Sequence, residues 1–335
     1  MFTPTVQQRI VPGIGNKNAR ICIIGESPGT EEDRLLRPFV GASGTILESC
    51  IHAAGITRPD CYMTNVVKVK PRGNDIAPYY MGTTGRFSLA GQEWVDILEE
   101  ELSEISSNVI VALGATALAA LTGMKSIAKY RGYVMESLPR FGSRKVIPAY
   151  HPAATLRGQY VLRYYITADF KKAKIESGWP EIIRPKRKII IPTTMSECRE
   201  WVAYLMLQPQ WACDIEVQNF EVSAIGFAPM PDIAISFSFS HQHWTEEEEV
   251  ELWSLMSDLL TSNITKVFQN GIFDINFLAT QCAIRVQPPI EDTMISHHVM
   301  YPDMLKGLGF LGSMYCGAQE YWKDVVKFTN IKEES

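Results

Sequence analysis

The chain has 335 residues, of which 46% are hydrophobic, and this is enough apolar material for substantial cores and about two domains. It holds no apolar run of about 18 residues and opens with no signal peptide, which argues against a membrane protein and predicts a cytoplasmic one. Residues 1–187 carry 24 Lys and Arg against 17 Asp and Glu, whereas residues 188–335 carry 8 against 20. The basic half is compatible with a polyanionic partner, and the acidic half fits a metal-binding or partner-facing domain.

A buried-strand run followed by a glycine-containing turn opens the first half. Residues 21–24 supply an apolar strand, and Pro28 prevents that strand from continuing. Gly25 and Gly29 let the backbone turn tightly and come close to a ligand. Glu26 is therefore delivered at the carboxyl end of a strand, the edge at which open α/β sheets bind ligands. A plain surface turn is the alternative.

Further along the same stretch, Phe39 lies between Pro38 and Gly41 rather than on a periodic apolar face. Its ring is therefore free to stack on a flat ligand. A helix over residues 45–54 follows, and Gly55 is suited to end it.

Strands, turns and helices alternate through the rest of the first half. Residues 61–69 predict a strand that carries Asn65 at its end. Asn65 is either a turn former or, because its amide both donates and accepts hydrogen bonds, a group that recognises a pyrimidine edge. The further elements expected are a helix, a strand, a helix and a strand, over residues 85–105, 108–113, 115–121 and 146–150. This alternation predicts a parallel sheet covered by helices on both faces.

Two further features of the first half suggest chemistry. His151 directly follows the last expected strand, in the same layer of the sheet edge as Glu26 and Asn65, and this position favours chemistry over a structural role. Residues 125–132 read KSIAKYRG and interleave three positive charges with Tyr130. Two interpretations of this segment stay open, a solvated loop and a surface that contacts DNA phosphates.

These motifs resemble those of the uracil-DNA glycosylase superfamily, with a spacing closest to its family 4. The matching strings are GESPG at residues 25–29, PFVG at 38–41, TNVVK at 64–68 and HPAATLR at 151–157. The resemblance implies a three-layer αβα domain with a parallel sheet over residues 1–178. It also implies excision of uracil from DNA, with the deoxyuridine extruded from the helix into a pocket.

The resemblance assigns roles to individual side chains. The implied catalytic residues are Glu26, which would orient or activate water, and His151, which would stabilise charge developing at a uracil carbonyl. Phe39 would stack on the base and Asn65 would bond its edge. The remaining substrate-binding residues are Gly25, Ser27, Gly29, Lys68 and Arg157, of which the last two would contact phosphate.

Typical family 4 enzymes carry an iron–sulfur cluster on four cysteines, one of which directly follows the lysine of the motif that reads TNVVK in this chain. Val69 stands at that position here. The chain has seven cysteines without a CxxC pair, so we expect reduced thiols. No alternative set of four cysteines has a spacing suited to cluster ligands, and we predict that no iron–sulfur cluster is present.

The pattern breaks at SGWPEIIRPKR, and we place a linker at residues 179–187 and a second domain at residues 188–335. In this domain a strand carries Asp214 and Glu216 on one face. Two adjacent carboxylates repel each other, and a bound cation would remove that cost, although a surface pair is the alternative. Asp274 follows an Asn-Gly turn and opens an apolar helix.

The strings DIE, NGIFDINFL and DTMISHHVMYPDM resemble the proofreading 3′–5′ exonuclease domain of family A DNA polymerases. This resemblance implies an RNase H-like (DnaQ-type) α/β fold in which Asp214, Glu216 and Asp274 hold Mg²⁺ or Mn²⁺. The third motif of the family, a tyrosine followed four residues later by an aspartate, is missing. We therefore expect an incomplete domain that is inactive alone. If it proved active, Asp292 or Asp324 would be the first candidates for the absent ligand.

The whole chain thus resembles the N-terminal part of a phage-type family A polymerase, which would act in the host cytoplasm. We expect it to excise uracil from DNA, with single-stranded or uracil-containing DNA as partner. A separately encoded polymerase domain or replisome proteins are further expected partners. The alternative is a non-catalytic DNA-binding or uracil-sensing module that positions a polymerase.

Overall fold

The computed structural model describes residues 9–239, 244–317, 321 and 324, and the chain forms two compact units. The second unit runs from Pro185 to Leu308, and the described residues from Gly309 onward belong with the first unit. The compact units therefore differ at the carboxyl end from the domains expected from the sequence, whose boundaries stay a prediction. No helix in the described ranges is long and apolar enough to cross a membrane.

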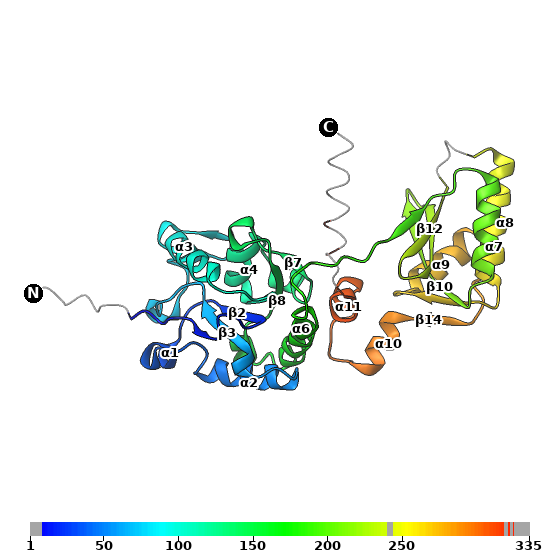
Figure 1. Cartoon of the computed structure of the whole chain (residues 1–335). Helices are drawn as coiled ribbons and strands as arrows, with labels where there is room; N and C mark the ends of the chain where they lie inside the picture. Colours follow the sequence, from blue (N-terminus) through cyan, green and yellow to red (C-terminus); the bar gives the residue numbers. More distant parts are fainter. Residues whose placement is uncertain (1–8, 240–243, 318–320, 322–323, 325–335) are drawn as a thin grey trace, which may run out of the picture. The chain divides into compact units, whose positions relative to one another are not determined.

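In the first unit, six of the described strands form a sheet in the order β1-β3-β2-β6-β8-β7 (Figure 1). The four central strands are parallel and completely buried: β2 (Ile21–Gly25), β3 (Cys61–Asn65), β6 (Val109–Leu113) and β8 (Lys145–Ala149). The short edge strands β1 (Ile14–Gly15) and β7 (Met135–Glu136) pair antiparallel with their neighbours. Apolar runs without alternation form such central strands because both faces of the sheet are covered.

Helices cover the two faces of this sheet and bury separate apolar clusters. Ile23 packs in the cluster of α2 (Ala42–Ala53) and α6 (Leu162–Glu176), and its neighbour Ile24 packs in the cluster of α3 (Leu89–Ser103) and α4 (Gly114–Thr122). This alternation confirms the expected three-layer αβα architecture. The remaining helices of the unit are α1 (Thr30–Leu35), α5 (Ile127–Tyr130) and α11 (Leu308–Tyr315), and the turn Pro152–Arg157 is a 3₁₀ helix.

The helix expected over residues 85–105 is shorter at its start. Residues 80–87 form a hairpin of β4 (Tyr80–Met81) and β5 (Arg86–Phe87). The helix begins after Ser88, whose hydroxyl accepts a hydrogen bond from the N–H of Gly91 (3.1 Å). A serine at this position satisfies an N–H that the helix cannot pair by itself, and this cap fixes where the helix starts.

The second unit is also an α/β structure. Six of its described strands form a mixed sheet in the order β14-β13-β10-β11-β12-β9. The strands are β9 (Lys188–Ile190), β10 (Gln210–Gln218), β11 (Glu221–Met230), β12 (Ile233–Ser238), β13 (Thr265–Phe268) and β14 (Ile290–Asp292). The helices are α7 (Met195–Met206), α8 (Glu246–Thr261), α9 (Ile272–Gln281) and α10 (Thr293–Met300). Trp211, Phe227 and Phe237 lie at the centre of the core.

Candidate active site

A cavity of about 490 Å³ lies at the carboxyl end of the first sheet. Its lining comes from the segments that follow β2, β3, β6 and β8, as expected for ligand sites in open parallel sheets. The structure brings together here most of the residues singled out in the sequence: Glu26, Ser27, Gly29, Phe39, Asn65, His151 and Arg157. Gly25 and Lys68 lie outside the lining.

Glu26 follows directly after β2, and α4 holds its carboxylate in place. The hydroxyl of Thr116, in the first turn of α4, donates a hydrogen bond to Oε2 of Glu26. This contact spans 90 residues of sequence. No motif surrounds Thr116, so sequence patterns do not point to this residue.

Phe39 is only 5% exposed and has a left-handed backbone, with φ of 54°. A non-glycine residue rarely adopts this conformation, so the surrounding structure must hold it. Glu32, which is buried, accepts hydrogen bonds from the N–H groups of Val40 (3.1 Å) and Gly41 (2.8 Å). Arg58 donates to the carbonyl of Phe39 (3.0 Å). These bonds fix the loop that carries the aromatic ring.

Gly25 shapes the pocket without lining it. A Cβ atom at this position would lie 2.7 Å from Cζ of Phe39 and 2.4 Å from Oδ1 of Asn65. Gly25 also pairs with Asn65 in the register of β2 and β3. Two pocket side chains therefore occupy the space that any larger residue would need.

His151 caps the turn that follows β8. Its Nδ1 atom accepts a hydrogen bond from the N–H of Ala153 (3.2 Å), so the proton of the neutral imidazole lies on Nε2. Burial, followed by the charge of Arg157, lowers the pKa of His151 from 6.5 to about 4, against an opposing effect of Glu32. The ring centroid lies 6.5 Å from that of Phe39. The imidazole is therefore neutral at physiological pH, with a donor on Nε2.

Lys68 is buried beneath the loop after β3 rather than at the surface. Its ammonium group donates to the hydroxyl of Thr64 (2.6 Å) and to the carbonyl of Asn65 (2.7 Å), and it forms an ion pair with Glu101. Burial lowers its pKa. The phosphate contact implied for Lys68 does not fit this position, because its three donors are already engaged inside the protein. Arg157 is exposed and lines the cavity, and its contact with phosphate stays a prediction.

Val69, which stands where a cluster ligand is expected, is 2% exposed and packs in the apolar cluster between the sheet, α3 and α4. All seven cysteines lie in the described ranges, and none forms a disulfide. Burial raises the pKa of Cys22 and Cys61. The absence of an iron–sulfur cluster remains a prediction.

The carboxylates of the second unit lie around β10. Asp214 and Glu216 are exposed on one side of this strand, in alternation with buried residues. Asp274 opens α9, and its Oδ1 accepts a hydrogen bond from the N–H of Ile215 (3.1 Å). Although Asp214 is exposed as a whole residue, partial desolvation of its carboxylate, followed by the charges of Asp274 and Glu216, raises its pKa to about 6. The three carboxylates are therefore close enough to repel one another.

Carboxylates are suitable ligands for Mg²⁺, and a metal site at Asp214, Glu216 and Asp274 stays a prediction. Over the described part of the chain, no three His, Cys, Asp or Glu side chains are grouped to hold a metal. Asp292 instead caps α10, and its carboxylate accepts from the N–H groups of Gly271 (2.8 Å) and Met294 (2.8 Å). Asp324 pairs with Lys129 and Tyr130 of the first unit. Both aspartates therefore already have partners within the protein.

Comparison with known proteins yields a match for each half of the chain. A family model described as "Uracil DNA glycosylase superfamily" matches residues 12–174, and one described as "3'-5' exonuclease" matches residues 190–329. The type-4 uracil-DNA glycosylase of Thermotoga maritima is 41% identical over 169 residues, which cover 49% of this chain and 81% of that protein. The type-4 enzyme of Archaeoglobus fulgidus is 39% identical over 170 residues, which cover 48% of this chain and 79% of that protein.

Other similarities cover smaller parts of the related proteins. The DNA polymerase of Bacillus phage SP01 is 30% identical over 146 residues, which cover 43% of this chain and 14% of that protein. Among solved structures, Escherichia coli RNase D matches with a TM-score of 0.33 and 16% identity, over 42% of this chain and 36% of that structure. The catalytic core of RRP6 from Trypanosoma brucei matches with a TM-score of 0.32 and 19% identity, over 39% and 35%.

Proposed function

The chain belongs, through its first half, to the uracil-DNA glycosylase superfamily, and on this premise we propose that it hydrolyses the N-glycosidic bond of deoxyuridine in DNA. The observation that carries the proposal is the cavity at the sheet edge. It gathers an aromatic ring, an amide, an imidazole and a carboxylate from four separate segments, which the sequence identifies as Phe39, Asn65, His151 and Glu26. A flipped base requires such a combination of stacking, edge recognition and acid–base groups.

Phe39 and Asn65 bind the base. The ring of Phe39 stacks on the extruded base, and its strained loop is held ready by Glu32 before DNA arrives. The amide of Asn65 pairs with the donor and acceptor on the pyrimidine edge. A rigid, preformed pocket reduces the loss of conformational freedom on binding.

The chemical step breaks the bond between C1′ of the sugar and N1 of uracil, and the bonding electrons leave with the base. Negative charge develops on a uracil carbonyl oxygen, and the Nε2–H group of His151 donates a hydrogen bond to that oxygen. A neutral donor that needs no reorganisation suits this role, and the Ala153 contact fixes its orientation. Glu26 orients a water molecule, whose oxygen bonds to C1′ and whose proton passes to the carboxylate.

For the second unit we propose a proofreading-type exonuclease fold without activity of its own. Any Mg²⁺ or Mn²⁺ would be held by Asp214, Glu216 and Asp274. The similarity to a phage DNA polymerase suggests a polymerase domain or other replisome proteins as partners. Single-stranded or uracil-containing DNA is the proposed substrate.

A labelled single-stranded oligonucleotide with one uracil tests the proposal. Incubation with the full chain should create an abasic site, which alkali converts into a strand break. An oligonucleotide with thymine in place of uracil should stay intact. If the protein binds the uracil strand but creates no alkali-sensitive site on single- or double-stranded DNA, the chain is a DNA-binding or uracil-sensing module instead.

A further inference from the structure

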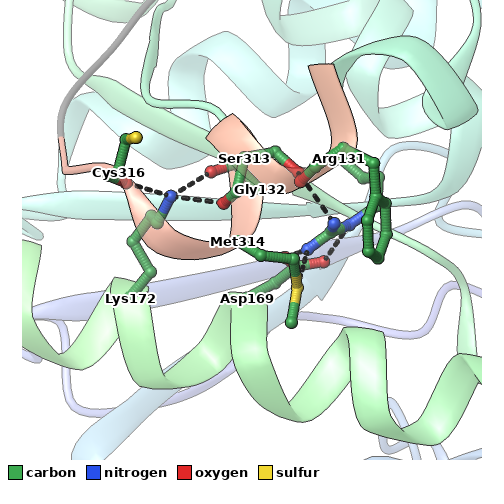
Figure 2. A network of polar contacts seen from close by, with 8 residues as sticks. Arg131, Gly132, Asp169, Lys172, Ser313, Met314 and Cys316 are labelled. Atoms are coloured by element: carbon green, nitrogen blue, oxygen red, sulfur yellow. Dashed lines mark hydrogen bonds and ion pairs between the residues drawn. The ribbon is translucent and has the colours of Figure 1, made fainter. Parts of the chain in front are cut away.

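Helix α11 docks on the rest of the first unit beside a buried ion pair (Figure 2). Arg131 and Asp169 are 2% and 1% exposed and form this pair. The guanidinium group of Arg131 also donates to the hydroxyl of Ser313 in α11 (2.9 Å). Arg131 therefore belongs neither to a solvated loop nor to a surface that contacts DNA. It links α11 to the rest of the first unit.

A second cation of the first unit holds the end of the same helix. Lys172, in α6, donates to the carbonyl oxygens of Gly132 (2.8 Å), Ser313 (2.5 Å) and Cys316 (2.8 Å). Figure 2 shows its ammonium group pointing at all three oxygens. A cation near the carboxyl end of a helix is favourable, because the last carbonyl groups carry partial negative charge and lack partners within the helix.

Apolar contacts complete the docking of α11. The ring of Phe310 lies 5.0 Å from that of Tyr165, between centroids, and Arg131 lies 5.2 Å from the centre of the Phe310 ring. Leu311 is 7% exposed. Tyr133 donates from its hydroxyl to the carbonyl of Gly309 (2.6 Å). One face of α11 is therefore buried by both polar and apolar contacts.

The docking surface continues into the cavity wall. Tyr165 contacts Tyr150, which lines the cavity, with ring centroids 6.2 Å apart. Gly132 donates from its N–H to the carbonyl of Pro148 in β8 (2.8 Å), and β8 delivers Tyr150 and then His151. Both sets of contacts thus connect α11 with the end of β8, the strand that His151 follows.

We propose that α11 is a positioning element of the excision site, with Phe310 acting through Tyr165 and Ser313 acting through Arg131. The segment lies outside residues 12–174, which match the glycosylase family model, so a glycosylase unit limited to that region would lack it. The chain passes from the first unit to the second at residues 184–185 and returns to the first at residues 308–309. This inference rests on the proposed excision of uracil.

The test compares full-length variants Phe310→Ala and Ser313→Ala with the parent protein. Leu308→Ala, at a position on the same helix that is 52% exposed, is the matched control, and Phe310→Leu is the conservative variant. Hydrogen exchange over residues 130–133 and 162–174 reports docking. Single-turnover excision at saturating DNA reports positioning, and DNA affinity is measured separately.

We expect Phe310→Ala to increase exchange in both segments and to slow excision roughly tenfold, with unchanged DNA affinity, since small displacements of reacting groups are costly. Phe310→Leu should retain most of the rate, and Leu308→Ala should match the parent. Unchanged exchange and excision in Phe310→Ala would overturn the inference and leave the proposed function intact. A parent protein without excision would overturn the proposed function and the positioning role with it.

Discussion

The hydroxyl of Thr116 donates a hydrogen bond to the carboxylate of Glu26, and this bond joins the first turn of α4 to the end of β2. The carboxylate is thereby oriented by a helix that no motif in the sequence connects with it. In the proposed mechanism, the orientation of Glu26 sets the direction in which water approaches the sugar.

We first predict that Thr116→Val slows excision about tenfold and that Glu26→Gln slows it about 100-fold or more, since general acid–base and orienting groups have effects of this order. Thr122→Val is the matched control, because Thr122 lies in the same helix and its hydroxyl bonds only backbone groups, donating to the carbonyl of Leu118 (2.7 Å) and accepting from the N–H of Met124 (3.2 Å). Single-turnover rates on a uracil strand measure these effects. Equal rates for Glu26→Gln and the parent would remove Glu26 from the mechanism.

Gly25 gives the second prediction. Gly25→Ala should weaken binding of uracil-containing DNA and lower the free energy of unfolding by about 1–3 kcal/mol, because its Cβ would overlap Phe39 and Asn65. Gly82→Ala should be close to neutral, since the nearest atom to its added Cβ is 4.0 Å away. Denaturant unfolding and binding titrations measure both variants. A fully stable and active Gly25→Ala protein would show that the pocket adapts more readily than its packing indicates.

The third prediction concerns pH. The pKa of His151 is about 4 in the folded protein, against 6.5 ordinarily, so the folded state prefers the neutral imidazole. The stability contribution is fully present above pH 6.5 and is lost as the pH falls towards 4. His151→Asn should therefore reduce the loss of unfolding free energy between pH 7 and pH 4.5 by about 2 kcal/mol.

Chemical unfolding at several pH values measures this difference, with His52→Asn as the exposed control. The excision rate of the parent protein should also stay constant between pH 8 and pH 5.5, because the imidazole of His151 remains neutral over this range. A His151-dependent transition near pH 6.5 would contradict the neutral donor.

The fourth prediction is that the full chain does not digest a 3′-labelled single strand with Mg²⁺ or Mn²⁺. Asp214, Glu216 and Asp274 are only three carboxylates for two ions, and Asp292 is engaged by backbone N–H groups. Asp214→Ala is the control, because it should abolish digestion by this chain but not digestion by a contaminating nuclease. Robust metal-dependent digestion that Asp214→Ala abolishes would show that a further ligand completes the site.

The fifth prediction is that the purified protein is colourless and holds no stoichiometric iron, because Val69 occupies the expected ligand position. Iron analysis and the visible absorption spectrum measure this directly. A brown preparation with a cluster absorption band would contradict it.

The sequence predicted the part of the site that lies next to strands. Glu26, Asn65 and His151 each follow a buried apolar run, and the ends of parallel strands meet at one edge, so their convergence could be foreseen. Glu32 could not be, because Glu31 and Asp33 beside it are typical of a solvated first turn. The only sequence feature that sets Glu32 apart is that it lies between Gly29 and Gly41.

The docking of α11 was also beyond sequence patterns. Its residues, LGFLGSMY, are mostly apolar and match the exonuclease family model, so their pattern indicates a buried helix without indicating which unit buries it. Arg131 and Lys172 resemble surface cations in the sequence. Only their tertiary partners, Asp169 and the carbonyl groups of α11, turn them into internal contacts.

The most direct test of the account is the release of free uracil from a uracil-containing single strand, measured by chromatography in parallel with binding of the same strand. The parent protein should release uracil in multiple turnovers, whereas His151→Ala should bind DNA comparably and release uracil about 100-fold more slowly, as expected when a preorganised donor is lost. Tight binding of the uracil strand by the parent without release of the base would contradict the account and identify a sensing module.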